Sequence, residues 1–175
     1  MNPPIANACT LPSLENGKTA HYPFARKNTD VLFVSDRIDE LGLDVYEFRV
    51  LAHLISRCKK GTRTCWPGIR GIAKKCRMCK NTVERAIGSL EHRGLIEVER
   101  RAGGVNVYAL EIVGDLLFVH RRLDDYGLTP TQFRVLAHCA RLADTGGLFF
   151  ISKRKFARVC GIKRDTVGHA IVFLQ

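Results

Sequence analysis

The sequence predicts a mainly α-helical fold with small β-hairpins, which is an α+β protein built from two tandem copies of one module. Three observations support this prediction. Residues 48–53 (FRVLAH) recur letter for letter at residues 133–138, 85 positions further along the chain. Each copy lies in a stretch whose apolar residues recur with helical spacing. After Gly94 the spacing changes to the alternation of β-strands, followed by a glycine-rich turn.

The repeat extends beyond these six residues. Residues 32–60 match residues 117–145 at 13 of 29 positions, which is too many for coincidence. We therefore divide the chain into a first module, residues 31–115, and a second module, residues 116–175. Residues 1–30 are rich in proline and asparagine and lack apolar periodicity, so we expect a flexible N-terminal arm.

Each module opens with a short apolar run that predicts a strand, at residues 31–34 and 116–119. A helix with an explicit start signal follows, in which a capping residue is paired with Glu or Gln three positions later. The two capping pairs are Asp44 with Glu47 and Thr129 with Gln132. Pro130 stands at the first helical position of the second module, where its missing N–H costs nothing.

The next segment of each module has the pattern of a helix–turn–helix. A small residue lets two helices approach, a tight turn follows four residues later, and a β-branched residue packs the second helix onto the core. These positions are Ala73, Arg77 and Val83 in the first module and Ala157, Gly161 and Val167 in the second. Glycine suits the backbone of such a turn better than Arg77 does.

In the first module a β-hairpin follows the second of these helices. Ile96 and Val98 alternate with glutamates, residues 100–104 (RRAGG) form a basic tip, and a second strand resumes at Val105. Helix, helix–turn–helix and hairpin together predict a winged helix, and the chain is expected to hold tandem winged helix-turn-helix modules. We expect the second module to be cut off before its wing, as in a fragment of a longer protein.

Charge placement favours a polyanionic partner. The chain carries 28 Lys and Arg against 17 Asp and Glu, a net charge of +11, and residues 48–83 contain ten basic residues and no acidic one. A merely solvated surface normally carries both signs, so this stretch favours nucleic acid. The residues expected to contact phosphates are Arg70, Lys74, Lys75, Arg77, Arg100, Arg101, Lys153, Lys155, Arg158 and Lys163.

These motifs resemble the winged helix-turn-helix domains of bacterial plasmid and phage replication initiators and related regulators. The matching residues are FV at 33–34, Asp44, FRVL at 48–51, CWP at 65–67, IA at 72–73, NTV at 81–83, AI at 86–87, Leu90 and RGLI at 93–96. Two features depart from the family. Cys79 and Lys163 stand where Ser or Thr usually caps the recognition helix, and residues 150–152 (FIS) replace CWP in the second module.

The resemblance implies which residues read DNA bases. They are Lys80, Asn81, Glu84 and Arg85 in the first module and Arg164, Asp165 and His169 in the second. Arg with guanine and Asn with adenine form bidentate pairs. Because the two sets differ, we expect the modules to read different sequences. Two modules suit adjacent sites on one face of a duplex, or one module on DNA while the other pairs with a second chain.

The seven cysteines raise a metal-sensing or redox-sensing alternative. Cys76 and Cys79 form a CxxC pair, and Cys58 and Cys65 upstream would complete a zinc or iron–sulfur set. The second module keeps a cysteine at only one of these four positions, Cys160, so we expect no metal and no cofactor. Cys79, at a helix N-terminus beside a lysine, is the candidate for a redox-sensitive thiol.

Two other features have a structural interpretation. His53 and His138 occupy identical helical positions, which duplication of a structural residue explains. Trp66 is expected to pack against the helices under the wing rather than to stack on a base.

Other classes of function find little support. The sequence lacks a phosphate-binding glycine motif, a nucleophile elbow and paired carboxylates, so we do not expect an enzyme. No apolar run approaches the ~18 residues of a membrane-spanning helix, and the N-terminus does not have the pattern of a secretory signal. An odd number of scattered cysteines fits a reduced compartment, so we expect a cytoplasmic protein associated with the nucleoid or a plasmid.

The resemblance and the charge together imply sequence-specific binding of double-stranded DNA, as a replication initiator that recognises origin repeats. A transcriptional regulator with the same domains is the alternative, and a winged-helix module that docks proteins is the alternative from another class. A second copy of the chain and replication proteins are the further partners considered. Neither a membrane nor a small-molecule substrate is expected.

Overall fold

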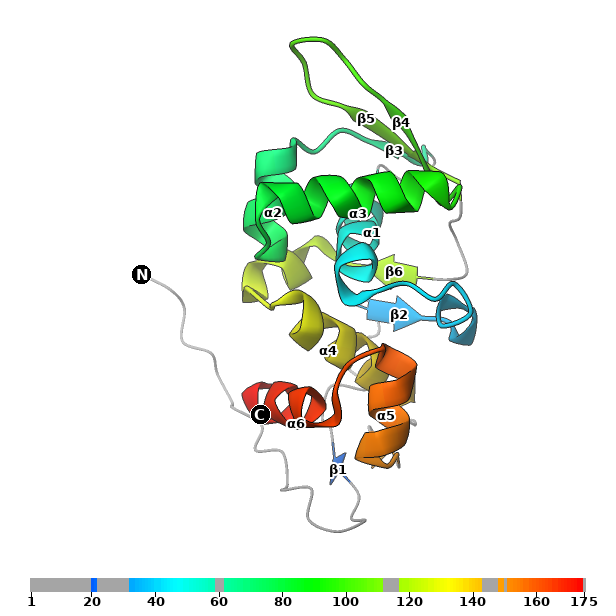
Figure 1. Cartoon of the computed structure of the whole chain (residues 1–175), viewed down its shortest axis with the longest axis vertical. Helices are drawn as coiled ribbons and strands as arrows, with labels where there is room; N and C mark the ends of the chain where they lie inside the picture. The colour runs from blue at the N-terminus through cyan, green and yellow to red at the C-terminus, as the bar shows by residue number, and fades with distance from the viewer. Residues whose placement is uncertain are drawn as a thin grey trace.

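The computed structural model describes residues 20–21, 32–58, 62–111, 117–142, 148–149 and 151–174 (Figure 1). A short strand, β1 (Ala20–His21), comes first. The first module then contains β2 (Leu32–Val34), the 3-10 helix η2 (Asp36–Ile38), α1 (Val45–Arg57), β3 (Thr64–Cys65), α2 (Ile69–Cys76), α3 (Lys80–His92), β4 (Ile96–Glu99) and β5 (Val107–Leu110). The second contains β6 (Leu117–Val119), the 3-10 helix η3 (Arg121–Tyr126), α4 (Pro130–Leu142), β7 (Leu148–Phe149), α5 (Lys153–Cys160) and α6 (Arg164–Phe173).

The predicted fold class is confirmed. Helices dominate the described residues, and the first module adds a small antiparallel sheet with the strand order β3-β5-β4. In both modules the helix–turn–helix takes the predicted place, as α2 and α3 and as α5 and α6. In the described part of the chain every helix is too short or too polar to cross a lipid bilayer.

The predicted start signals of α1 and α4 both form. The Asp44 carboxylate accepts from the N–H of Glu47 at 2.8 Å, and the Glu47 carboxylate accepts from the N–H of Asp44 at 2.9 Å. In α4 the Thr129 hydroxyl accepts from the N–H of Gln132 at 3.3 Å, and the Gln132 amide oxygen accepts from the N–H of Thr129 at 2.9 Å. Each cap satisfies N–H groups that the helix itself leaves unpaired and contributes about 1 kcal/mol.

The turns between the paired helices also have the predicted geometry. Gly161 has a φ of 66° and Arg77 a φ of 52°, so both lie in the left-handed region. Among the described residues Arg77 is the only one other than glycine with a positive φ. Val83 and Val167 are fully buried, as the pattern predicted. The fold therefore holds Arg77 in a backbone conformation that costs a non-glycine residue roughly 1–2 kcal/mol.

The hairpin of the first module is the predicted wing, with one boundary corrected. Ile96 and Val98 point inward, and the two glutamates that alternate with them are exposed. The second strand begins at Val107 rather than at Val105, which is 47% exposed. Pairing between β4 and β5 ends with Glu99 opposite Val107, so Val105 lies in the loop beyond the ladder.

In the second module β7 stands between α4 and α5, where β3 stands between α1 and α2 in the first. It pairs antiparallel with β1, with Ala20 opposite Phe149 and His21 opposite Leu148. These two residues of the predicted flexible arm therefore take part in a sheet. The rest of residues 1–30 lies outside the described part of the chain.

The two modules share one hydrophobic core. Strand β2 pairs antiparallel with β6, and α1 packs against α4 (Figure 1). Phe48 and Phe133, which are both fully buried, lie with their ring centres 5.9 Å apart. The main core cluster continues from the first module into β6, η3 and α4 without a break, and a smaller cluster fills the space between α4, α5 and α6. The modules are therefore packed together rather than merely joined in tandem.

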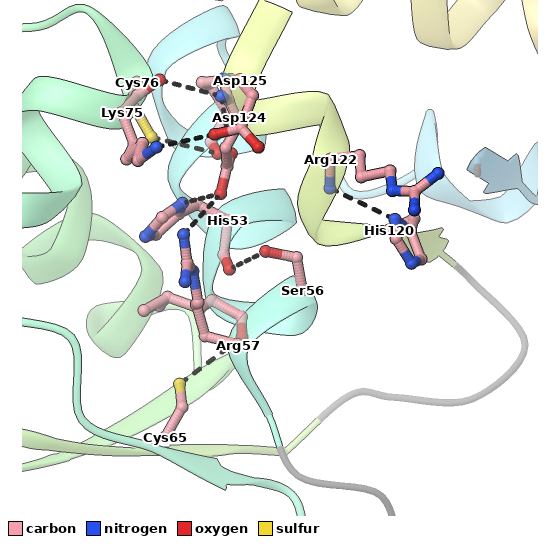
Figure 2. A network of polar contacts seen from close by, with 12 residues as sticks. His53, Ser56, Arg57, Cys65, Lys75, Cys76, His120, Arg122, Asp124 and Asp125 are labelled. Carbon is pink, nitrogen blue, oxygen red and sulfur yellow. Dashed lines mark hydrogen bonds and ion pairs between the residues drawn. The ribbon is translucent and has the colours of Figure 1, made fainter.

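Two buried arginines cross the boundary between the modules. Arg49 Nη2 lies 2.9 Å from Asp124 Oδ1, and Arg134 Nη2 lies 2.9 Å from Asp39 Oδ1. His53 joins the first of these clusters, with its Nδ1 2.8 Å from Asp124 Oδ2 (Figure 2). A buried charge is tolerated only when it is paired and hydrogen-bonded, so each carboxylate fixes the arginine that faces it.

His53 and His138 both belong to these boundary clusters. His138 is buried like His53, and its Nδ1 lies 3.9 Å from Asp39 Oδ2. Their shared helical position therefore has the structural role that the sequence indicated.

The Asp124 carboxyl has a strongly perturbed pKa. Burial acts to raise this pKa, but the hydrogen bond from His53, the charges of His53 and Arg49 and the hydrogen bond from Arg49 together outweigh burial and lower it to about 2. A carboxyl whose pKa is depressed by folding stabilises the protein above its unfolded pKa of about 4 and loses that contribution as the pH falls toward 2.

We predict that Asp124→Asn lowers the free energy of unfolding by about 3 kcal/mol or more, because it leaves the Arg49 guanidinium buried without a counter-charge. Denaturant-induced unfolding at neutral pH measures the change. Asp125→Asn is the matched control, because Asp125 is 66% exposed and forms only a surface ion pair with Lys75. The control should change stability by no more than about 1 kcal/mol. Equal effects of the two substitutions would contradict the assignment.

A second prediction concerns pH. Between pH 4 and pH 2 the protein should lose about 2 kcal/mol of unfolding free energy through protonation of Asp124, in addition to the losses from its other carboxyls. In the Asp124→Asn variant this part of the loss should be missing. Unfolding curves of both proteins at several pH values in this window measure the difference, and parallel pH profiles would refute the role of Asp124.

Candidate nucleic-acid interface

Helix α3 presents one buried face and one exposed face. Val83, Ala86, Ile87 and Leu90 form the buried face and hold the helix against the core. All four predicted base-reading residues of this helix, Lys80, Asn81, Glu84 and Arg85, lie on the exposed face. The structure therefore brings them together on one accessible surface. Whether they contact bases stays a prediction.

The four side chains are not equivalent in the free protein. Lys80 Nζ lies 3.4 Å from Glu84 Oε1, which is an ion pair one helical turn apart. Asn81 and Arg85 form no such pair with any described residue. Neither of these two side chains would have to give up an ion pair before it contacts a base. Asn can form two hydrogen bonds with adenine, and Arg can form two with guanine.

The N-terminus of α3 is open. Cys79 occupies the cap position without a side-chain hydrogen bond to the helix backbone, and its Sγ lies 3.0 Å from Thr82 Oγ1 instead. This hydrogen bond lowers the pKa of the exposed Cys79 thiol below its ordinary value. Lys163 at the start of α6 likewise makes no side-chain cap. The two replacements of Ser or Thr therefore leave both helices without the usual side-chain cap. The positive ends of the helix dipoles favour an anion such as phosphate there.

Helix α6 carries the corresponding surface of the second module. Its predicted base-reading residues, Arg164, Asp165 and His169, are all exposed. Arg164 Nε lies 3.5 Å from Asp165 Oδ1, and both side chains are more than two-thirds exposed. The chemical character of this surface differs from that of α3, as the sequence predicted.

The predicted phosphate contacts of the first module fall into two groups. Arg70 and Lys74 are exposed on α2 and form no ion pair with the described residues. Lys75 Nζ instead lies 2.7 Å from Asp125 Oδ1, and Arg77 Nη1 donates to the Gly127 carbonyl at 2.8 Å. These two side chains are directed at the second module and help to join it to the first.

The arginines of the wing are also paired. Arg100 Nη1 donates to Glu91 Oε1 at 2.8 Å, and Arg101 Nε donates to Glu99 Oε1 at 2.9 Å. Both arginines remain more than half exposed. A phosphate would have to compete with a carboxylate for each of them, so we expect these two arginines to be weaker phosphate contacts than the sequence implied.

The predicted phosphate contacts of the second module are all exposed and form no ion pair with the described residues. They are Lys153, Lys155, Arg158 and Lys163. They lie on α5 and on the turn between α5 and α6, which matches the placement of Arg70 and Lys74 on α2.

The prediction for Trp66 is wrong. Trp66 is 53% exposed and so is not packed away beneath the wing, whereas its neighbour Cys65 is buried. Trp66 follows the last residue of β3 and precedes the cap residue Gly68 of α2, so the chain already runs along the surface there. It lines a pocket of about 390 Å³ together with Arg57 and Lys75.

The cysteines are distributed over separate environments. Cys58 and Cys65 share a hydrogen bond that lowers the pKa of the Cys58 thiol and raises that of Cys65. Burial raises the pKa of Cys76 to about 12, and its Sγ faces the Arg49 carbonyl. Within the described residues no group of three or more His, Cys, Asp or Glu side chains could hold a metal ion.

Comparison with known protein families agrees with this geometry. The helix-turn-helix domain family matches residues 41–96 and 126–172, which cover α1 to the start of β4 and the corresponding helices of the second module. The chain belongs to the helix-turn-helix domain family. This match supports a DNA-binding domain in the chain, with DNA as a partner. No curated protein and no solved structure matches the chain.

We predict that Arg85→Ala and Asn81→Ala each weaken binding to a preferred duplex by about 1–3 kcal/mol and relax the base preference at one or two positions. Selection from a randomised duplex library, followed by affinity measurements, detects both effects. Arg37→Ala is the control, because Arg37 is an exposed arginine outside both helix–turn–helix units. If all three variants select the same sequences with the same affinity, α3 does not read bases.

Proposed function

We propose that this helix-turn-helix protein binds double-stranded DNA sequence-specifically and initiates replication of a plasmid-type or phage-type element. The observation that supports specific binding most strongly is the exposed face of α3. Asn81 and Arg85 stand there without an ion pair, next to the open helix N-terminus and the basic side chains of α2. We further propose that the protein acts by binding and has no catalytic activity of its own.

Six exposed basic side chains without ion-pair partners among the described residues support the electrostatic part of this function. They are Arg70 and Lys74 in the first module and Lys153, Lys155, Arg158 and Lys163 in the second. Side chains of this kind release counterions from DNA without first giving up an internal partner. The arginines of the wing and the pair Lys75 and Arg77 are less suited to that task because they are already bound within the protein.

The role in initiation rests on the resemblance and on the fused pair of modules. A single chain that carries two different readers suits an origin, where binding sites stand in a fixed order. A transcriptional regulator would begin with the same DNA contacts. Mapping the sites bound in the source genome separates the two. Clustered sites beside an origin, together with loss of plasmid maintenance when the gene is deleted, are expected for an initiator. A single operator overlapping a promoter, with replication unaffected, would contradict initiation.

The salt dependence of binding tests the electrostatic contribution. With ~6 phosphates neutralised, the logarithm of the association constant should fall against the logarithm of the salt concentration with a slope of about −5. Titration of a labelled duplex at several salt concentrations measures this slope. Affinity that does not depend on salt, or no duplex binding at low salt, would refute the proposal.

Two neighbouring lysines provide a matched test of which side chains face the DNA. Lys74→Ala should make the slope shallower by about 1 and weaken binding to all sequences alike, because Lys74 has no internal ion pair. Lys75→Ala should leave the slope nearly unchanged, because Lys75 is bound to Asp125. The same titrations detect both effects. A larger change in slope for Lys75→Ala than for Lys74→Ala would mean that DNA approaches from a different side.

A further inference from the structure

The contacts between the two modules come in reciprocal pairs. In the pairing of β2 with β6, Phe33 lies opposite Phe118, its own counterpart in the repeat, and Leu32 and Val34 lie opposite Val119 and Leu117. With the repeat offset of 85, Val119 is the counterpart of Val34 and Leu117 is the counterpart of Leu32. Exchanging the two modules therefore reproduces the same set of residue pairs. A strand pair with this register has a two-fold axis through its central pair.

The helices obey the same rule. The Arg49 guanidinium lies over the Phe133 ring at 4.3 Å, and the Arg134 guanidinium lies over the Phe48 ring at 4.3 Å. The buried ion pairs follow it too, because Arg49 binds Asp124 and Arg134 binds the counterpart, Asp39. Every one of these contacts occurs twice, with the roles of the two modules exchanged.

Such reciprocity is the property of a two-fold symmetric dimer interface, in which one surface patch is complementary to itself. Here both halves belong to one chain. Helix α3 packs on α1, α1 packs on α4 and α4 packs on α6, so the symmetry of the central pair extends to the outer helices. Figure 1 shows α3 and α6 on opposite sides of the α1–α4 pair, running in opposite directions.

We propose that one chain reads an imperfect inverted repeat, with α3 on one half-site and α6 on the other. This inference rests on the proposed DNA binding and specifies its target. Duplex DNA has two-fold axes of its own, so two readers related by such an axis meet half-sites of opposite orientation, spaced by about one helical turn. The two halves differ in sequence because Asn81 and Arg85 on α3 correspond to Asp165 and His169 on α6.

The β4–β5 hairpin forms a wing next to α3 in the first module. Contacts beyond the recognition groove are therefore expected beside the α3 half-site. In an origin that carries several binding sites as direct repeats, each repeat would contain one imperfect inverted pair of half-sites and would bind one chain.

Four synthetic duplexes test the orientation. The parent is the sequence that the full chain selects from a randomised library. In the others the second half-site is replaced by its reverse complement, scrambled, or moved by five base pairs. The proposal predicts that all three changes reduce affinity by about tenfold or more, which is the loss expected when a bidentate base contact is removed. It also predicts one bound chain per full site, measured by sedimentation of the complex.

Each other outcome has a definite meaning. Equal affinity for the parent and the reversed half-site, no effect of scrambling, or two chains per full site would overturn the proposal and leave DNA binding intact. Failure to bind any duplex would overturn both. His169→Ala should abolish sensitivity to the second half-site while Arg85→Ala keeps it, and because both side chains are exposed, neither variant should unfold. Loss of sensitivity in Arg85→Ala alone would also refute the assignment.

Discussion

The arrangement of this protein depends on the two buried arginines that cross between its modules. Arg49 is completely buried, yet its charge is met by Asp124 and by the face of Phe133, both from the other module. Arg134 of the second module makes the corresponding contacts with Asp39 and the Phe48 ring of the first module. Buried ion pairs contribute little net stability. They do raise the free energy of any other packing of the two modules, because moving one partner away would leave a buried charge unpaired. The angle between α1 and α4 is thereby fixed, and with it the directions in which α3 and α6 face.

Local features of the fold could be predicted from the sequence because their causes are local. Each of these features depends on a few neighbouring residues. Examples are the helix caps at Asp44 and Thr129, the left-handed turn at Gly161 and the burial of Val83 where α3 packs on the core. The packing of the modules against each other depends on residues far apart in the chain and was missed. A signal was present, however. The repeated hexapeptide keeps Arg and His along with its apolar residues, whereas a helix that only fills a core needs apolar residues alone.

The same distinction applies to the candidate interface. The exposed face of α3 followed from helical spacing, but the partners of Lys75, Arg77 and Arg100 could not be inferred from it. Asp125 and Gly127 lie 50 positions from the side chains that they bind, and Glu91 faces the wing only after the hairpin has folded back. A stretch without acidic residues is therefore not equivalent to a free basic surface, because acidic residues from elsewhere in the chain cover part of it.

Hydroxyl-radical footprinting of the full chain on its selected duplex tests the central claim most directly. Two readers fixed by one two-fold axis should protect two segments of backbone on the same face of the DNA, about one helical turn apart. Protection should extend further at the α3 half-site, because the wing of the first module lies there. A single protected groove, or two segments on opposite faces of the duplex, would contradict the account.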